Sequence, residues 1–308
     1  MKTLFESILS KSKVSSGGVG DAITEEQIFE IYKKLYAHKY PRLVDQGRSR
    51  LFTVNAGTLT LLKDAGSIID AVFISDVHDQ CGINKIVFDS SAKLQTIYNS
   101  ISKNTPNDTN ITSVEFSVSI PILFRNLSYK RTICTDCAFT NTRPGKATAK
   151  NNMFDVSDGN QRFNNCNFNN LSIKTRLIGE HFRRFTHCTF DSSCAFHIDI
   201  HSQYVYVNAP ELYRFLRKMG IGLSTNSRYD AWRLDSHIDK NITYTELVDR
   251  IFPDNNIQDC TIQLGGGAGA LIITKNKPSR RKLAEAAADY MDYMPCIQLN
   301  DGTWMYKK

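Results

Sequence analysis

The chain has 308 residues, of which 41% are hydrophobic and 22% are charged, and its formal net charge is +7. This length is enough to bury a full core, and such a composition excludes wholesale disorder. Because no apolar run approaches about 18 residues, we expect no membrane span. The basic residues are scattered, which predicts a solvated surface, with weak contact to nucleic acid as the alternative.

The first nine residues, MKTLFESIL, form a short amphipathic segment. Four apolar side chains share one helical face of it, namely Leu4, Phe5, Ile8 and Leu9. A Ser-, Gly- and Lys-rich linker follows up to residue 22. These features predict either a docking peptide that binds a partner through that face, or a helix that packs on its own domain. The start lacks a long apolar stretch, so we expect no secretory signal.

Residues 23–110 are predicted to form an α+β module. Apolar residues at helical spacing from Ile28 to Tyr36 predict an amphipathic helix that ends before Pro41. Four short apolar runs predict strands, at residues 51–54, 58–62, 71–74 and 85–88. The polar segment 102–110 is a candidate domain boundary.

Residues 111–206 are predicted to be rich in β-strands. Strict alternation of apolar residues from Val114 to Ile122 predicts one strand. A motif then recurs, with an aromatic residue or cysteine, two residues, a cysteine, one residue and a phenylalanine. Its copies are Cys134–Phe139, Phe163–Phe168 and Phe185–Phe190, followed by the half copy Cys194–Phe196.

The spacing of this motif favours a β-solenoid. Its second cysteines, Cys137, Cys166 and Cys188, lie 29 (166 − 137) and 22 (188 − 166) residues apart. Repeats of this length suit the coils of a solenoid, in which Cys and Phe point inward and stack on the next coil. A Greek-key sandwich with similar strands is the alternative.

Residues 207–308 are predicted to form a C-terminal α+β module. Helices are expected after Asn208 and Thr243, each with a glutamate three residues later, and a last helix is expected from Ser279 to Pro295. Strands are expected at 260–264 and 270–274, around a glycine-rich turn, and the tail is a candidate edge strand. The whole chain is therefore predicted to be α+β, with a solenoid-like or sandwich middle flanked by helix-containing modules.

The eight cysteines are predicted to be reduced and buried, because the chain is long and shows no secretory signal. The pair Cys134-x-x-Cys137 could be half of a zinc site, but a structural zinc site needs a second closely spaced pair. We therefore expect packed thiols and no metal or cofactor.

Two further groups are candidate metal ligands. Asp76 and His78 follow an apolar run and resemble the Asp-x-His start of metallophosphoesterases, without the downstream motifs of those enzymes. His197, Asp199 and His201 share one face of a predicted strand, which is either a metal site or simply the solvent face. A metal-dependent phosphoesterase-like hydrolase is thus an alternative, although no complete catalytic constellation is present.

The opening MKTLFESIL resembles the N-terminal segment of many proteins of crAss-like bacteriophages. The resemblance covers about ten residues and implies a phage protein, located in the virion or in the host cytoplasm, whose leader docks to other phage proteins. With the repeats and the tethered start, it favours a structural or interaction protein that is not an enzyme and that could form oligomers. A nucleic-acid-binding accessory protein is a further alternative.

Overall fold

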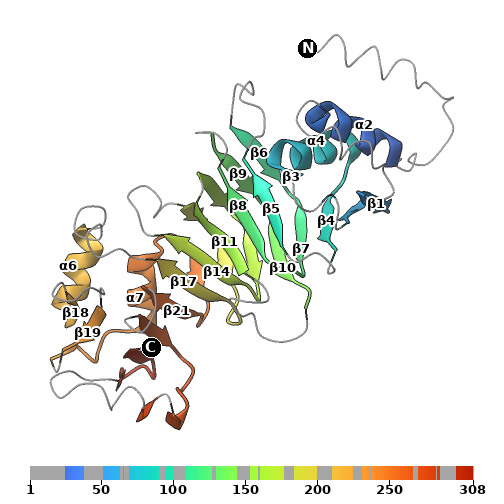
Figure 1. Ribbon diagram of the computed structural model, residues 1–308. Coiled ribbons are helices and arrows are strands. Elements are labelled where there is room, and N and C mark those ends of the chain that lie inside the picture. Colours follow the sequence, from blue (N-terminus) through green and yellow to red (C-terminus); the bar gives the residue numbers. More distant parts are fainter. Residues whose placement is uncertain are drawn as a thin grey trace.

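The computed structural model describes residues 25–37, 51–62, 65, 69–89, 94–99, 108–126, 130–143, 153–158, 160–176, 184–199, 210–224, 231–235, 237–265, 270–281, 283–284 and 296–307. Their strands form three long sheets, drawn in Figure 1, and one short hairpin of β18 (Ile221–Ser224) and β19 (Ala231–Leu234). None of the helices in these ranges is long and apolar enough to cross a lipid bilayer.

Each sheet is built from strands that are distant in the sequence. Sheet A has eight strands: β1 (Phe52–Asn55), β2 (Thr58–Leu61), β4 (Lys85–Phe88), β7 (Glu115–Val118), β10 (Ala138–Asn141), β13 (Asn167–Asn169), β16 (Thr189–Phe190) and β20 (Asn256–Ile257). Sheet B has ten: β3 (Ile69–Asp70), β5 (Gln95–Tyr98), β8 (Ile122–Arg125), β11 (Met153–Asp158), β14 (Ser172–Arg176), β17 (Ala195–Asp199), β21 (Thr261–Leu264), β22 (Leu271–Thr274), β24 (Trp304–Lys307) and β23 (Cys296–Gln298). Sheet C has four: β6 (Thr109–Thr112), β9 (Thr132–Thr135), β12 (Gln161–Asn164) and β15 (Phe185–Thr186).

The chain visits the three sheets in turn, and each circuit forms one coil of a β-solenoid. From β4 to β14 every strand pairs in parallel with the strand three places later, for example β7 with β10 and β10 with β13. The fold is therefore a β-rich α+β fold with a solenoid-like middle, as the motif spacing predicts. Among the described strands, the antiparallel pairing that a Greek-key sandwich requires is confined to β1–β2, β18–β19 and the run of β21, β22, β24 and β23.

A left-handed residue turns the chain at each corner between sheets C and A. Asp136, Asn165 and His187 stand at this position with φ of 56°, 52° and 54°. Side chains alternate along a strand, so two residues three positions apart can both point inward only if the strand is interrupted between them. Asn, Asp and His suit the interrupting position, because they adopt positive φ more readily than most residues. The repeated motif thus forms one corner of the coil. It begins with an inward residue of sheet C, passes through the turn residue and an inward cysteine, and ends with an inward phenylalanine of sheet A.

The motif phenylalanines stack along the inside of sheet A. Successive rings of Phe116, Phe139, Phe168 and Phe190 lie 4.7, 5.1 and 4.7 Å apart, with interplanar angles of 4°, 8° and 8°. The in-register parallel pairing of β7, β10, β13 and β16 sets this spacing. All four rings are buried, which confirms the inward direction predicted for them.

Two predicted elements are corrected. The alternating run from Val114 to Ile122 is not one strand, because the chain bends after Val118 and continues in the next sheet as β8. The residues stay buried on both sides of the bend. Ile111 to Phe116 is in fact an earlier copy of the corner motif, with Ser113 at φ 56° and Val114 in place of the cysteine.

The second correction concerns residues 71–74, which form the start of helix α4 (Ala71–Cys81) and not a strand. The Asp70 side chain accepts a hydrogen bond from the Val72 N–H at the N-cap, and Gly82 ends the helix with φ 63°. Helix α4 stands between a strand of sheet B and a strand of sheet A, where later coils have a sheet C strand, and it packs on β6.

Helices cover both ends of the solenoid, as Figure 1 shows. At the N-terminal end α2 (Glu25–Tyr36) buries the expected apolar face and packs on α4. At the other end lie α6 (Pro210–Lys218) and α7 (Tyr244–Ile251). The capping box of Thr243 and Glu246 is present as predicted. The tail forms a hairpin of two strands, β23 and β24.

The long sheets run across the boundaries that the sequence suggests at residues 110 and 206. Strand β4 pairs with β7, and β5 pairs with β8, across the first boundary. Strand β17 pairs with β21, and β16 with β20, across the second. Neither boundary therefore marks the end of a sheet.

Candidate interaction surface

The inside of the solenoid is filled by side chains. Rings from all three sheets meet there: Phe139 of sheet A lies 5.0 Å from Phe154 of sheet B and 5.7 Å from Phe163 of sheet C, centroid to centroid. These edge-to-face contacts are a favourable arrangement for aromatic rings and occupy the space between the sheets. Chemistry in this part of the molecule therefore belongs to its outer faces.

The motif cysteines are packing residues of the corners. The thiols of Cys137, Cys166 and Cys188 each donate to a carbonyl of the preceding coil, at 3.5, 3.4 and 3.2 Å. The accepting carbonyls are those of Ile111, Cys134 and Phe163, which occupy the same place in successive coils. A cysteine thus fills a small apolar site and supplies a weak donor.

The half copy occupies a different corner, between sheets A and B. The Cys194 thiol donates to the Phe168 carbonyl at 3.4 Å, and the Cys260 thiol to the Asp191 carbonyl at 3.0 Å. Burial raises the pKa of Cys260 to about 12 and also raises that of Cys194 well above its ordinary value. These thiols stay protonated at neutral pH. Among the described residues, no three His, Cys, Asp or Glu side chains are placed to hold a metal ion.

The Asp76 and His78 pair does not have the geometry of a metallophosphoesterase site. Both residues lie within helix α4, where positions two apart point in different directions, and not at the end of a strand. The His78 Nδ1 atom is 2.7 Å from the Ile83 carbonyl oxygen, just beyond the end of the helix. Burial, followed by the charge of Asp79, raises the pKa of Asp76. We therefore assign both residues a structural role in helix α4, in which His78 contacts the segment that follows the helix.

The other histidine group lies partly on an outer face. On β17 His197 and Asp199 are half-buried and alternate with the buried Phe196 and Ile198, as the sequence predicts for a solvent face. His201 lies outside the described residues. The Nε atom of Arg176 is 3.6 Å from the Asp199 carboxylate, so that carboxylate faces a cation.

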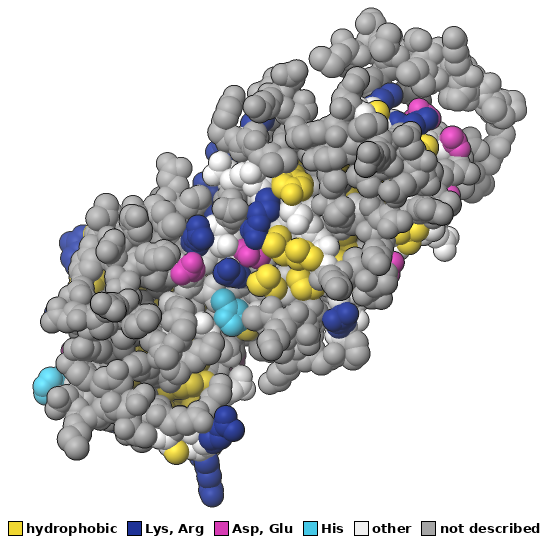
Figure 2. Space-filling view, in the orientation of Figure 1, with side chains coloured by type: hydrophobic (Ala, Val, Ile, Leu, Met, Phe, Trp, Pro, Cys, Tyr) yellow, Lys and Arg dark blue, Asp and Glu magenta, His cyan; other side chains and the backbone are white. Residues whose placement is uncertain are grey.

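His197 and Asp199 belong to a larger surface, which we call the outer B face. It comprises the outward residues of five neighbouring strands of sheet B: Thr96 and Tyr98 of β5, Leu123 and Arg125 of β8, Met153 and Asp155 of β11, Lys174 and Arg176 of β14, and His197 and Asp199 of β17. Figure 2 shows hydrophobic, basic, acidic and histidine side chains gathered over these strands. Parallel register aligns them in rows that cross the strands.

Asp155 organises the charges of the outer B face. Its carboxylate accepts hydrogen bonds from the Ser157 N–H at 2.9 Å and from the Ser157 hydroxyl at 2.5 Å. Arg125 and Lys174 approach it from the two adjacent strands, at 3.5 and 3.7 Å. Burial raises the pKa of Asp155, but the Ser157 hydrogen bonds and the two cations outweigh burial and hold the pKa below its ordinary value.

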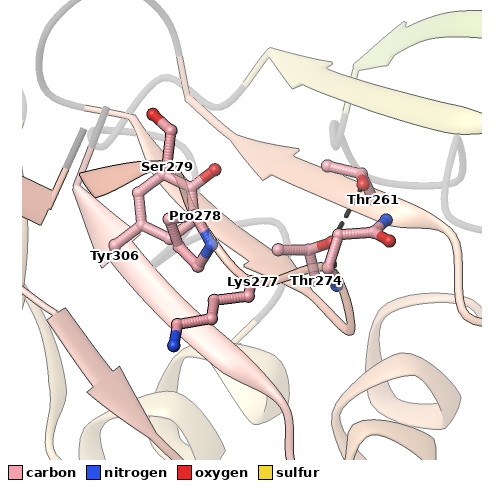
Figure 3. A pocket seen from close by; sticks show the side chains of 7 residues that line it. Thr261, Thr274, Lys277, Pro278, Ser279 and Tyr306 are labelled. Carbon is pink, nitrogen blue, oxygen red and sulfur yellow. Dashed lines mark hydrogen bonds between the residues drawn. The ribbon is translucent and has the colours of Figure 1, made fainter. Parts of the chain in front are cut away.

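The described residues also line recesses elsewhere on the surface. One of about 300 Å³ borders β21, β22 and β24, and is lined by Thr261, Thr274, Asn276, Lys277, Pro278, Ser279 and Tyr306. Figure 3 shows the bond between the Thr261 and Thr274 hydroxyls, at 3.0 Å, on one side of this recess and the Tyr306 ring on the other. The second, of about 420 Å³, lies on the outer side of sheet A around Lys85 and Glu115.

Of the residues of the outer B face, the sequence patterns identify only His197 and Asp199. The candidate docking residues Leu4, Phe5, Ile8 and Leu9 lie outside the described residues, and no local sequence pattern identifies the basic residues of β8 and β14 as part of a site. Alternation in Ser172–Arg176 places Lys174 and Arg176 on one side of a strand, but which strands lie beside it depends on pairing across coils. Comparison with family models, curated proteins and solved structures finds no match for this chain.

Proposed function

We propose that this chain is a structural or interaction protein of a bacteriophage, which acts in the virion or in the host cytoplasm. It contacts other phage proteins through its N-terminal segment and its β-rich surface. The observation that carries the proposal is a solenoid whose interior is filled by stacked rings while its outer faces carry organised polar and charged rows. A solenoid of this kind can bind partners only through its outer faces.

The hydrolase alternative has less support, because Asp76 and His78 lie on a helix and do not converge. The binding role also agrees with the amphipathic start and its linker, which suit a tethered docking peptide. Oligomerisation through the same surfaces belongs to this proposal.

The test is to look for the protein in purified particles of the phage that encodes it, and to identify its neighbours by chemical cross-linking and mass spectrometry. We expect the protein in the particle or in a stable complex from infected cells. Absence from particles, together with elution of the cellular protein at its monomer mass, would contradict the proposal.

A second test addresses the N-terminal segment. Removing residues 1–20 should leave the unfolding transition unchanged and abolish association with the cross-linked partner. Unchanged association would exclude docking through Leu4, Phe5, Ile8 and Leu9, and would leave the outer faces as the binding surface.

A further inference from the structure

The outer B face has an apolar part beside a basic part. The apolar part consists of Tyr98 on β5, Leu123 on β8 and Met153 on β11, whose side chains point outward. Leu94, which directly precedes β5, is 42% exposed. On β14 the side chains of Lys174 and Arg176 are 43% and 41% exposed. A partner could therefore reach both parts.

The basic part keeps a positive balance. Among the described side chains of this part, the three cations Arg125, Lys174 and Arg176 stand against the two carboxylates of Asp155 and Asp199, a formal charge of +1 (3 − 2). The surface charge thus favours an anionic occupant.

The ion pairs of this face are looser than those elsewhere on the molecule. The Lys174 Nζ and Arg176 Nε atoms stand 3.7 and 3.6 Å from their carboxylates. By contrast, Lys85–Glu115 closes to 2.6 Å, and both Arg131–Asp108 and Lys275–Asp301 close to 2.8 Å. Distances beyond about 3.2 Å are not strong hydrogen bonds, so the donors of Lys174 and Arg176 can turn to carboxylates of another molecule.

We propose that the outer B face docks an acidic polypeptide segment that also carries apolar side chains. Its carboxylates lie against Lys174 and Arg176, and its apolar side chains cover Leu123 and Met153. Aliphatic side chains beside cations match a polypeptide better than a polysaccharide or a nucleic acid, which bring no aliphatic side chains to cover them. The proposal rests on the interaction role argued above and specifies the chemistry of its partner.

The size of the face sets the length of the probe. Four strand-to-strand steps separate β5 from β17, which is about 19 Å at about 4.8 Å per step, and an extended segment of about six residues spans that distance. A fluorescein-labelled peptide of about ten residues, half Leu and Ser and half Glu, is therefore long enough. Its binding to the full chain is measured by fluorescence anisotropy.

Lys174→Glu and Lys85→Glu form a matched pair of variants. Both lysines point outward from a strand and pair with a carboxylate, with side-chain exposures of 43% and 36%. We expect Lys174→Glu to weaken peptide binding at least about tenfold, which is about 1.4 kcal/mol. Lys85→Glu, on sheet A, should change the affinity for the peptide by no more than about twofold relative to wild type, since charges more than about 10 Å apart are screened at ordinary salt. Lys174→Gln and Arg176→Gln repeat the test if the charge reversal unfolds the chain.

Three results would overturn the proposal: equal loss in the two lysine variants, absence of binding at about 1 mM peptide, or tighter binding of oligothymidylate or polygalacturonate than of the acidic peptide. A protein that is found in particles but fails this test retains its interaction role and loses only this docking face. A protein that associates with nothing loses the role itself.

Discussion

At the scale of the residue, the outer B face shows how a nearly buried carboxylate is kept charged. The Asp155 side chain is only 4% exposed, yet its pKa is lowered, because Ser157 donates to it twice and two cations approach from adjacent strands. A buried charge is stable only when it is paired and hydrogen-bonded. Asp155 therefore connects the stability of the solenoid to the charge pattern of its surface.

Asp155→Asn should lower the free energy of unfolding by about 1–3 kcal/mol at pH 7, since a charge-assisted bond is lost and cations remain unbalanced. Because folding lowers the pKa of Asp155, its contribution is present above the unfolded carboxyl pKa of about 4 and is lost as the pH falls through the folded value. The difference between wild type and variant in urea unfolding should thus shrink between pH 7 and pH 3.

Asp199→Asn is the control, because the Asp199 side chain is 33% exposed and its carboxylate lies 3.6 Å from the Arg176 Nε atom. Its effect at pH 7 should be the smaller of the two. A cost for Asp155→Asn that is the same at both pH values would show that the lost hydrogen-bond geometry, and not the charge, is what matters.

At the scale of the element, the corner between sheets C and A is the repeated unit of the fold. Four residues at this corner, Ser113, Asp136, Asn165 and His187, have φ between 52° and 56°. Their main chains also link the coils: the Ser113 N–H donates to the Thr135 carbonyl at 3.0 Å, and the Asp136 N–H donates to the Asn164 carbonyl at 3.0 Å. The corner therefore fixes both the change of direction and the register of the next coil.

Ser113→Val should lower the free energy of unfolding by about 1–3 kcal/mol, because a β-branched residue is strained at positive φ. Ser113→Gly should stay within about 1 kcal/mol of the wild type, since glycine relieves the left-handed strain but loosens the unfolded chain. Urea unfolding of the purified variants provides the comparison.

The neighbouring Thr112→Val supplies the control for that series. Thr112 is exposed at the end of β6, and its replacement should change stability by no more than about 0.5 kcal/mol. Equal costs at positions 112 and 113 would mean that valine disturbs the surface generally, and the left-handed backbone would not be the reason.

At the scale of the whole molecule, the solenoid needs closed ends, because the last coil otherwise leaves inward rings and strand edges uncovered. At the C-terminal end the Phe252 ring lies 4.5 Å from Phe196, just after helix α7. Asn255 ties the same segment to the last coil, since it accepts from the Cys188 N–H and donates to the Phe185 carbonyl, both at 2.9 Å. The insertion between β17 and β20 thus serves as a cap.

Phe252→Ala should lower the free energy of unfolding by about 3–5 kcal/mol, since it removes a buried ring and opens the end of the core. Phe215→Ala is a matched control, because Phe215 is only partly buried and contacts Arg250, with that guanidinium 5.2 Å from its ring. Urea unfolding and size-exclusion chromatography at rising concentration provide the measurements. Equal costs at both positions, with both variants monomeric, would argue against the capping role.

The sequence alone determines which residues point inward. The alternation within each strand, the Cys-x-Phe spacing and the capping box at Thr243 are local patterns, and local sterics and hydrogen bonding set the conformation of a few consecutive residues. These patterns predict the stacked phenylalanines and the packed thiols, and both lie where the pattern places them.

Only the tertiary structure decides how those strands are joined and what the outer faces contain. An apolar run suits a strand or a buried helix equally, so the helix at residues 71–81 follows from its position at the end of the solenoid. The bend after Val118 likewise follows from the passage of the chain to the next sheet. The row of Leu123, Asp155 and Lys174 unites residues from three coils. Their proximity depends on long-range register, which the packing of the coils fixes and no local pattern contains.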